Sequence, residues 1–530
     1  MADDLTEKAQ QLFVEDGDNA STVRDPEAEK RLVRKLDLVL TPLFFVVYLI
    51  TFIDRANVGN ARVAGLEADL GLVGYQYVSW LVLVGSPPPA FFDPFLTLSS
   101  LFYPLFPERR QFISLSIFYV FYALWEMPSN VVCKILGARI WLPAQVFAFG
   151  LVCMCTAFVR NFGGFLAVRI MLGIAEGGVL PAMSLVLSRF YKKDELIFRI
   201  ALFVSAAALA GGFGGLLASG FISAGGIPGV GPAWRTIFFA EGLITIGIAA
   251  VVAIFSVSGP EDAWWLTAEQ KALATARITK NVSTAEHVQD VDRSSNRAAI
   301  FRYLSTPVPW ICAFGYLTTN VTVQGVSLFS PTILKAMYPG MSTVQIQLRS
   351  VPPYAVAFVW SLFIAFLSAK INRRGIPLLM SYPLALVGYA LFLGTHNVKA
   401  RYAGIFLNIL GAFPSGPMWM AWSINCAATD TERSIAAGLV PGFGQFGALI
   451  ATWTYLPKDA PEYRTGNSME IGFTCANIAL IFLMLTYIHF ENRARQAGKR
   501  DHRFNEVEGL ETKEQIKRLG SRHPAWMFPA

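Results

Sequence analysis

The chain has 530 residues, of which 54% are hydrophobic and only 15% are charged, and its net charge is +7. Soluble domains carry about 25% charged residues, so this composition excludes an ordinary soluble protein and indicates a chain that crosses a membrane many times. The basic residues stand in short clusters between apolar segments. That pattern excludes a nucleic-acid-binding protein and is typical of cytoplasmic loops beside anionic lipid.

Apolar runs of membrane-crossing length recur along the whole chain. A helix needs about 20 such residues to cross the hydrocarbon core, at about 1.5 Å per residue. We therefore expect an all-α membrane protein with twelve transmembrane helices in two pseudo-symmetric halves of six. The expected spans are 37–57, a second within 75–133, 138–158, 162–189, 199–224, 234–256, 308–334, 350–370, 376–394, 400–424, 434–456 and 469–490.

Polar stretches divide the chain around these spans. The N-terminal stretch has no apolar signal-peptide core, so we expect the first span to direct membrane insertion. Lysine and arginine gather before span one, between spans four and five, and between spans eight and nine, which places these ends and both termini in the cytoplasm. We expect a multi-pass protein of the plasma membrane. The expected divisions are a cytoplasmic tail at 1–35, a first half at 36–256, a cytoplasmic connector at 257–306, a second half at 307–490 and a cytoplasmic tail at 491–530.

The second span is interrupted by prolines and charges. An odd number of extra crossings here would send every later basic loop outside, so we interpret residues 83–114 as an insertion without a net crossing. The segment is either re-entrant or on the surface, or it is not native protein but a retained intron or a misjoined gene. We favour the second interpretation because deletion joins 74–80 to 115–122 in one apolar helix.

An acid and a base, Asp54 and Arg55, stand side by side near the end of the first span. Holding them there is costly, because each loses water that hydrocarbon cannot replace. Either the pair is wetted at the membrane surface, or Arg55 faces an internal cavity and holds an anion while Asp54 carries a proton. We favour the internal site.

Span four carries a second acid and base. Arg169 and Glu176 lie two turns apart, about 10 Å, on one helix face, where Gly173 allows a neighbouring helix to approach. They form either a structural link or, as we favour, a proton-responsive switch. We expect no histidine to carry a proton through the membrane core, which leaves carboxylates. Those within the expected spans all lie in the first half: Asp54, Glu126, Glu176 and Glu241.

Several motifs make a resemblance specific. The stretches 54–61 (DRANVGNA), 125–130 (WEMPSN), 169–178 (RIMLGIAEGG), 234–242 (WRTIFFAEG) and 458–466 (KDAPEYRTG) resemble the fungal allantoate-permease-like branch of the anion:cation symporter family, within the major facilitator superfamily. The resemblance implies the major facilitator fold and uptake of a small carboxylate together with protons. Allantoate, ureidosuccinate, nicotinate and pantothenate belong to this substrate class. The transporter would work by alternating access of its two halves around a midplane site.

The candidate site combines charge in the first half with neutral polar groups in the second. Tyr122 offers its hydroxyl to the cavity, or alternatively only packs. We assign substrate binding to Arg55, Tyr122, Arg169, Asn320, Gln324 and Asn425, and proton coupling to Asp54 and Glu176. No metal or other cofactor is expected, since no cysteine shows metal-ligand spacing.

Two basic loops resemble the cytoplasmic gate motifs of the superfamily. Lys134 with Arg139, and Arg373 with Arg374, either latch the outward-facing state or only anchor the loops at the membrane. We interpret Glu126 and Glu241 as structural. The expected partners are the organic anion, protons and the lipid bilayer, with no nucleic acid, and we expect a monomer. Competing functions are a nutrient sensor built on a transporter scaffold and an inactive product of the insertion.

Overall fold

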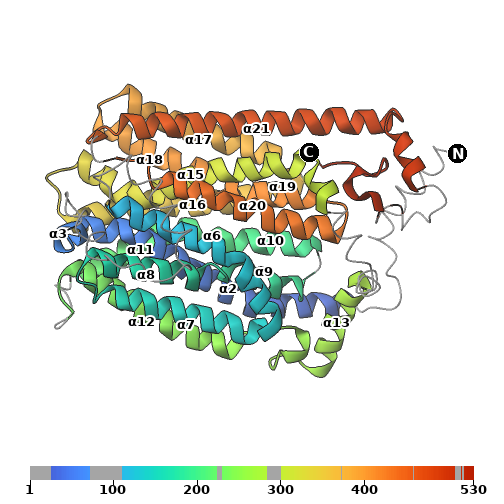
Figure 1. Cartoon of the computed structure of the whole chain (residues 1–530), viewed down its shortest axis with the longest axis horizontal. Coiled ribbons are helices and arrows are strands. Elements are labelled where there is room, and N and C mark those ends of the chain that lie inside the picture. The colour runs from blue at the N-terminus through green and yellow to red at the C-terminus, as the bar shows by residue number, and fades with distance from the viewer. Residues whose placement is uncertain are drawn as a thin grey trace, which may run out of the picture.

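A computed structural model describes residues 26–71, 110–191, 193–223, 230–282, 300–371, 373–456, 459–507, 515 and 518–529. Long helices run side by side along the longest axis, with the first half and the second half in separate layers (Figure 1). The first half consists of α2 (Pro26–Val63), α3 (Leu66–Asp69), α6 (Arg110–Leu136), α7 (Ala138–Thr156), α8 (Phe162–Glu176), α9 (Val179–Ser188), α10 (Lys193–Val204), α11 (Ala206–Ser223) and α12 (Ala233–Phe255).

The second half repeats this plan. A connector with η1 (Pro260–Asp262) and α13 (Ala268–Val282) precedes it. Its helices are α15 (Pro307–Met337), α16 (Thr343–Ile371), α17 (Gly375–Gly394), α18 (Val398–Ala412), α19 (Ser415–Cys426), α20 (Asp430–Ala451) and α21 (Arg464–Gln496), followed by η4 (Asp501–Val507) and η5 (Gly520–Arg522). Large apolar side chains such as Leu38, Ile135 and Val359 stay exposed, as a lipid-facing surface requires.

The expected all-α architecture is confirmed, with six crossings in each half. Nine helical segments of the described chain are long and apolar enough to cross a membrane by length and composition. The other three crossings are α6, α15 and the pair α18 and α19. Three expected spans are each built from two consecutive helices, namely α8 with α9, α10 with α11, and α18 with α19. The pair α18 and α19 is interrupted at Pro414, whose missing N–H breaks helix bonding.

Two expected boundaries stay predictions. The N-terminal tail was expected to reach residue 35, but α2 is already helical from Pro26. Most of the interpreted insertion, residues 83–109, lies outside the described residues. Helix α6 begins at Arg110 and passes Leu115 without a break, so the end of this segment and the second span form one helix. The insertion therefore stays a prediction.

We call the end of the bundle where α2 begins the basic end, and the end where α2 finishes at Val63 the far end. The halves meet closely toward the far end. Gly59 of α2 lies so near the backbone of Leu328 in α15 that a side-chain carbon at this position would overlap the Leu328 carbonyl. The Ser116 hydroxyl lies 2.8 Å from the Thr452 hydroxyl and accepts a bond from the Trp453 indole at 2.9 Å. These contacts join the two halves across the far end.

At the basic end, the ion pairs hold each half together instead. Arg277 of α13 is fully buried and bonds to Glu29 of α2 at 2.8 Å and to Glu195 of α10 at 2.7 Å. Arg199 pairs with Asp37 at 2.6 Å. In the described parts of the chain, ion pairs at this end stay within the first half and the connector, or within the second half and its tail. The ion pairs of Arg277 and Arg199 therefore strengthen the first half and its connector, while α10 also packs against α16 and α19 of the second half.

Candidate substrate and proton site

A buried ion pair joins α2 to α8. The Arg55 Nε donates to Glu176 Oε1 at 2.5 Å, and the two side chains are 7% and 0% exposed. The Arg55 guanidinium also lies 4.5 Å from the ring centroid of Tyr122 and 5.3 Å from that of Phe52. Because removing one member of such a pair strands the other charge, each residue depends on its partner.

Two glycines bring α6 and α8 close enough to build this pair. A side-chain carbon at Gly173 would collide with the backbone of Phe118, and one at Gly177 would collide with the Tyr122 carbonyl. Because both positions are glycine, α6 can place the Tyr122 ring over Arg55, and α8 can bring Glu176 to the same guanidinium. Small residues at helix contacts serve this purpose in membranes. The expected close approach at Gly173 is found.

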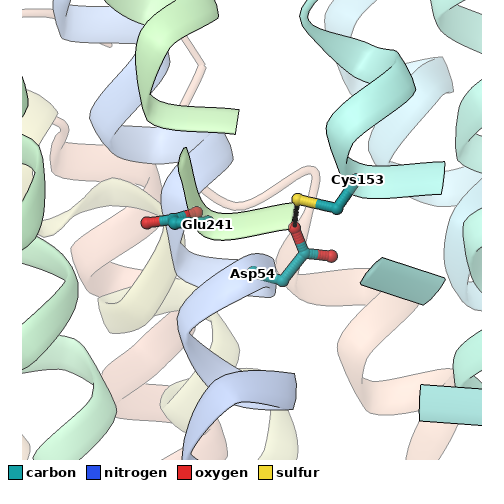
Figure 2. A group of neighbouring side chains, drawn as sticks. All are labelled: Asp54, Cys153 and Glu241. Atoms are coloured by element: carbon teal, nitrogen blue, oxygen red, sulfur yellow. Dashed lines mark hydrogen bonds between the residues drawn. The ribbon is translucent and has the colours of Figure 1, made fainter. Parts of the chain in front are cut away.

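The Asp54 side chain points toward Cys153 of α7 (Figure 2). The Cys153 thiol of α7 donates to Asp54 Oδ1 at 2.9 Å. Glu241 of α12 lies beside them, and neither of its carboxyl oxygens has a hydrogen-bond partner among the described residues. All three side chains are buried. This cluster could not be predicted from the sequence, since Cys153 lies 99 residues from Asp54 along the chain.

A thiol and two carboxylates are also donors that a divalent cation can use, and one ligand atom from each lies within 4.8 Å of the others. A metal would require the thiol to lose its proton. That proton is engaged in the bond to Asp54, and the positive charge of Arg169 acts on the same carboxylate. The arrangement therefore fits a proton-holding group, in which the thiol orients Asp54, better than a cation site.

Arg169 of α8 supplies the second buried positive charge. It is 2% exposed, and its guanidinium lies 4.9 Å from the ring centroid of Phe165 and 5.6 Å from that of Phe238. Its Nε and Nη2 have no hydrogen-bond partner in the part of the chain that the structure describes. Glu176, on the same helix, takes Arg55 as its partner instead of Arg169. The site thus pairs acids and bases across helices, and Arg169 keeps unused donors.

The second half contributes polar groups at different depths. Gln324 of α15 reaches the first half, since its Oε1 accepts from the Tyr119 hydroxyl at 3.0 Å. Asn320 donates to the Gly444 carbonyl at 2.7 Å and so links α15 to α20. Of the three amides expected to bind substrate, Gln324 is the one that this structure bonds directly to the first half.

The third amide, Asn425, lies at the basic end of α19. With its amide oriented so that the oxygen faces Arg374, this oxygen accepts from Nε and Nη2, both at 3.2 Å. Arg374 also donates to the Ser368 hydroxyl at 2.7 Å. Asn425 therefore does not join the group around Arg55, and the structure brings it together with an expected gate residue.

The remaining expected residues are spread along the first half and the basic end. Glu126 of α6 is 7% exposed, and its Oε2 has no hydrogen-bond partner. The side chains of Arg139 and Arg373 are exposed, and the Arg139 backbone N–H donates to the Ser258 hydroxyl at 3.1 Å. Lys134 lies on α6, and its side chain is outside the described residues. The gate role of these basic residues therefore stays a prediction.

One buried carboxylate was missed. Glu470 of α21 is fully buried, and its Oε2 accepts from the Thr322 hydroxyl at 2.8 Å. Its Oε1 lies against Gly325, where a side-chain carbon would approach it to 2.8 Å. The expectation that all carboxylates within the spans lie in the first half is therefore wrong. The signal was available, because the expected span 469–490 itself contains position 470.

Comparison with known proteins defines the class. Residues 44–484 match the Major Facilitator Superfamily, so the chain belongs to this family of transporters and is not an enzyme. An uncharacterized transporter of Schizosaccharomyces pombe, C1039.04, is 30% identical over 502 residues, which cover 93% of this chain and 90% of that protein.

Other relatives agree with this assignment. The high-affinity nicotinic acid transporter of Saccharomyces cerevisiae is 27% identical over 469 residues, covering 88% of this chain and 80% of that protein. Among solved structures, a partially occluded inward-open conformation of the E. coli xylose transporter XylE aligns with a TM-score of 0.56 and 15% identity, covering 86% of this chain and 98% of that chain. At this identity the structural likeness supports the fold alone.

Proposed function

We propose that this transporter takes up a small organic anion together with protons by alternating access. The observation that carries the proposal is the buried pair of Arg55 and Glu176, which joins α2 to α8 at 2.5 Å. A guanidinium matches a carboxylate in charge and in geometry. An arriving substrate carboxylate can therefore replace Glu176 as the partner of Arg55.

That replacement links the substrate to a proton. Once the substrate engages Arg55, Glu176 loses its counter-ion in a site without solvent exposure. A buried carboxylate without a partner costs several kcal/mol, and binding a proton removes this cost. We assign proton coupling to Glu176 and to Asp54. The Asp54 carboxylate accepts a hydrogen bond from the Cys153 thiol and is attracted by the positive charge of Arg169.

Energetics also favour protons as the coupling ion. A monoanion entering a cell that is negative inside works against roughly 2.3 kcal/mol per 100 mV. One proton cancels the substrate charge, and a second makes the voltage helpful. Carboxylates next to arginine are groups that can carry these protons within the spans.

The contacts between the halves suggest which step of the cycle this conformation represents. The halves touch at Gly59 and Leu328 and around Ser116 toward the far end, whereas ion pairs at the basic end stay within each half. With the basic end in the cytoplasm, as the lysine and arginine pattern predicts, this is a state closed to the outside. The nicotinic acid transporter of yeast supports a carboxylate substrate, in keeping with the resemblance to the allantoate-permease-like branch.

A panel of radiolabelled small carboxylates, offered to proteoliposomes with an inward proton gradient, tests the proposal. The transporter should accumulate at least one of them, and Arg55→Ala should abolish binding. Stranding a buried charge costs about 3–5 kcal/mol, which is more than a hundredfold in affinity. Arg62→Ala is the control, because Arg62 pairs with Glu67 in a partly exposed bridge.

Two outcomes would contradict the proposal. A protein that binds a carboxylate but never accumulates it is a sensor and not a transporter. If Arg55→Ala binds within about threefold of the wild type, less than the loss of even one hydrogen bond to a charged group, the anion site lies elsewhere.

A further inference from the structure

A second charged site lies at the basic end, away from the buried pairs. A cavity of about 330 Å³ opens between the start of α15, the end of α21 and the C-terminal tail. Pockets for small ligands have volumes of roughly 300–1,000 Å³, so the space suffices for a small polar ligand. The charged side chains that line it are Glu491, Arg495, Arg500, Arg503 and Arg522.

Positive charge in this cavity greatly exceeds negative charge. Glu491 is the one acid among these lining residues, and it is shared by Arg495 at 3.2 Å, Arg500 at 2.6 Å and Arg503 at 3.5 Å. Arg522 adds a fourth guanidinium to the lining. One carboxylate cannot neutralise four guanidiniums, so the lining residues that the structure describes carry an excess of three positive charges.

The arginines differ in how far their donors are used. Arg495 holds the tail through both of its Nη groups, which donate to the carbonyls of Ser521 at 3.1 Å, of His523 at 3.3 Å and of Trp526. Arg503 donates from Nη1 to the Arg522 carbonyl at 3.0 Å, but its buried Nε has no hydrogen-bond partner among the residues that the structure describes.

Arg522 keeps its side-chain donors, since its side chain forms no hydrogen bond with any residue that the structure describes. Burial lowers the pKa of the Arg503 guanidinium, and the charges of Arg500 and Arg522 lower it further while Glu491 opposes them. An anion in the cavity would accept hydrogen bonds from the unused donors and would reduce the repulsion between the guanidinium groups.

A helix end adds to this positive field. Helix α15 has 31 residues, and its first residues, Thr306 at the N-cap and Pro307, line the cavity. The N-terminus of a long helix carries a partial positive charge, which favours an anion, although Pro307 and Pro309 remove two backbone N–H groups from this first turn.

Exposed aromatic side chains surround the cavity, as is typical of the depth of the lipid headgroups. Phe490 is 64% exposed and immediately precedes Glu491, and Phe301, four residues before Ser305, is 74% exposed. Tyr487 lines the cavity itself. Exposed aromatic side chains beside a cluster of arginines mark the boundary between hydrocarbon and water.

We propose that this cavity binds a phosphate-bearing anion, either the headgroup of an inositol phospholipid or a soluble phosphate, and that the bound anion fixes the C-terminal tail to the second half. Phosphate oxygens accept paired bonds from guanidinium groups, which matches Arg500, Arg503 and Arg522. The same arginine cluster holds the tail carbonyls at 521, 522, 523 and 526, so neutralising its charge stabilises the docked tail.

The test measures binding to the purified full-length protein. Inositol hexakisphosphate and inorganic phosphate are titrated in detergent by calorimetry, and nanodiscs with or without phosphatidylinositol bisphosphate, at equal anionic charge, are compared by thermal unfolding. Arg522→Gln removes a cavity charge without breaking a hydrogen bond to any described residue. Arg493→Gln removes the same charge from an exposed position of α21 outside the cavity lining.

We expect Arg522→Gln to weaken binding about tenfold, the worth of one charge-assisted bond, and Arg493→Gln to leave it within twofold. Binding of a soluble phosphate would identify a free ligand, and stabilisation in the bisphosphate nanodiscs alone would identify a lipid headgroup. The proposal fails if neither source binds, or if the two variants weaken binding equally, since the attraction would then be nonspecific. Should Arg522→Gln not fold, Arg503→Gln replaces it under the same criteria.

Discussion

Replacing Glu176 with glutamine tests the coupling mechanism most directly. Glutamine keeps the size of the side chain and an acceptor for the Arg55 Nε, which now lies 2.5 Å from Glu176 Oε1, but it cannot bind or release a proton. The variant should therefore imitate the protonated site permanently. Arg55 loses its buried counter-ion, so the anion should bind without competition from Glu176 while the link to protons disappears.

The size of the effect follows from the proton gradient. One pH unit supplies about 1.4 kcal/mol for each coupled proton, which corresponds to a tenfold accumulation ratio. In proteoliposomes with an inward gradient of one pH unit, the wild type should reach at least about tenfold accumulation of the labelled anion. Glu176→Gln should reach a ratio near one, because exchange continues without a driving force.

Exchange of labelled for unlabelled substrate separates loss of coupling from loss of function. Glu176→Gln should retain this exchange, and the control Glu67→Gln, which alters a partly exposed bridge to Arg62, should retain both exchange and accumulation. A full pH-driven gradient in Glu176→Gln vesicles would refute the coupling role of this residue and leave Asp54 as the candidate.

Three further outcomes are expected. Gly59→Ala should slow transport and lower the stability of the protein by about 1–3 kcal/mol, because the added carbon overlaps the Leu328 carbonyl. The control Gly247→Ala should be neutral, because its added carbon meets no atom within 4 Å. Equal effects of the two variants would contradict the close contact at Gly59. Burial and, less strongly, the charge of a neighbouring arginine lower the pKa of His523 to about 4, so the docked tail favours neutral histidine. Docking of the tail should be complete above pH 6.5 and should weaken as the pH falls toward 4, by up to about 1.4 kcal/mol per pH unit. Limited proteolysis of the tail should therefore accelerate as the pH falls over this range. In His523→Gln, the rate of proteolysis should no longer depend on pH in this way. Mature transcripts should lack the codons for residues 83–114, and long-read sequencing that finds them in nearly all messages would rule out a retained intron.

Much of the site could be anticipated because charge in a membrane is costly. Arg55, Arg169 and Glu176 are conspicuous in apolar spans, and the structure buries all three. Their pairing could not be anticipated. Helical spacing relates Glu176 only to residues of its own helix, whereas its partner is 121 residues away on α2, brought there by helix packing. The same limit explains why the bond from Cys153 to Asp54 was missed.

For the amide side chains, residue type did not predict the position in the bundle. Asn320, Gln324 and Asn425 were chosen because the second half was expected to offer only neutral polar groups, but polarity alone does not specify depth or direction. Gln324 bonds to Tyr119 of the first half, while Asn425 faces Arg374 at the basic end. Glu470 shows a different failure, in which the residue lay within an expected span and was overlooked.

The sequence by itself determined the class of protein and the number of crossings, because hydrocarbon requires every crossing to be a helix of sufficient apolar length. It also determined which charged residues need an internal site, because their burial cost depends on residue type and depth. Only the tertiary structure decided which acid meets which base, where the two halves touch, and that the C-terminal tail closes a cavity lined by arginines. These features depend on distances between helices far apart in the chain, and such distances are set by side-chain packing across the whole bundle.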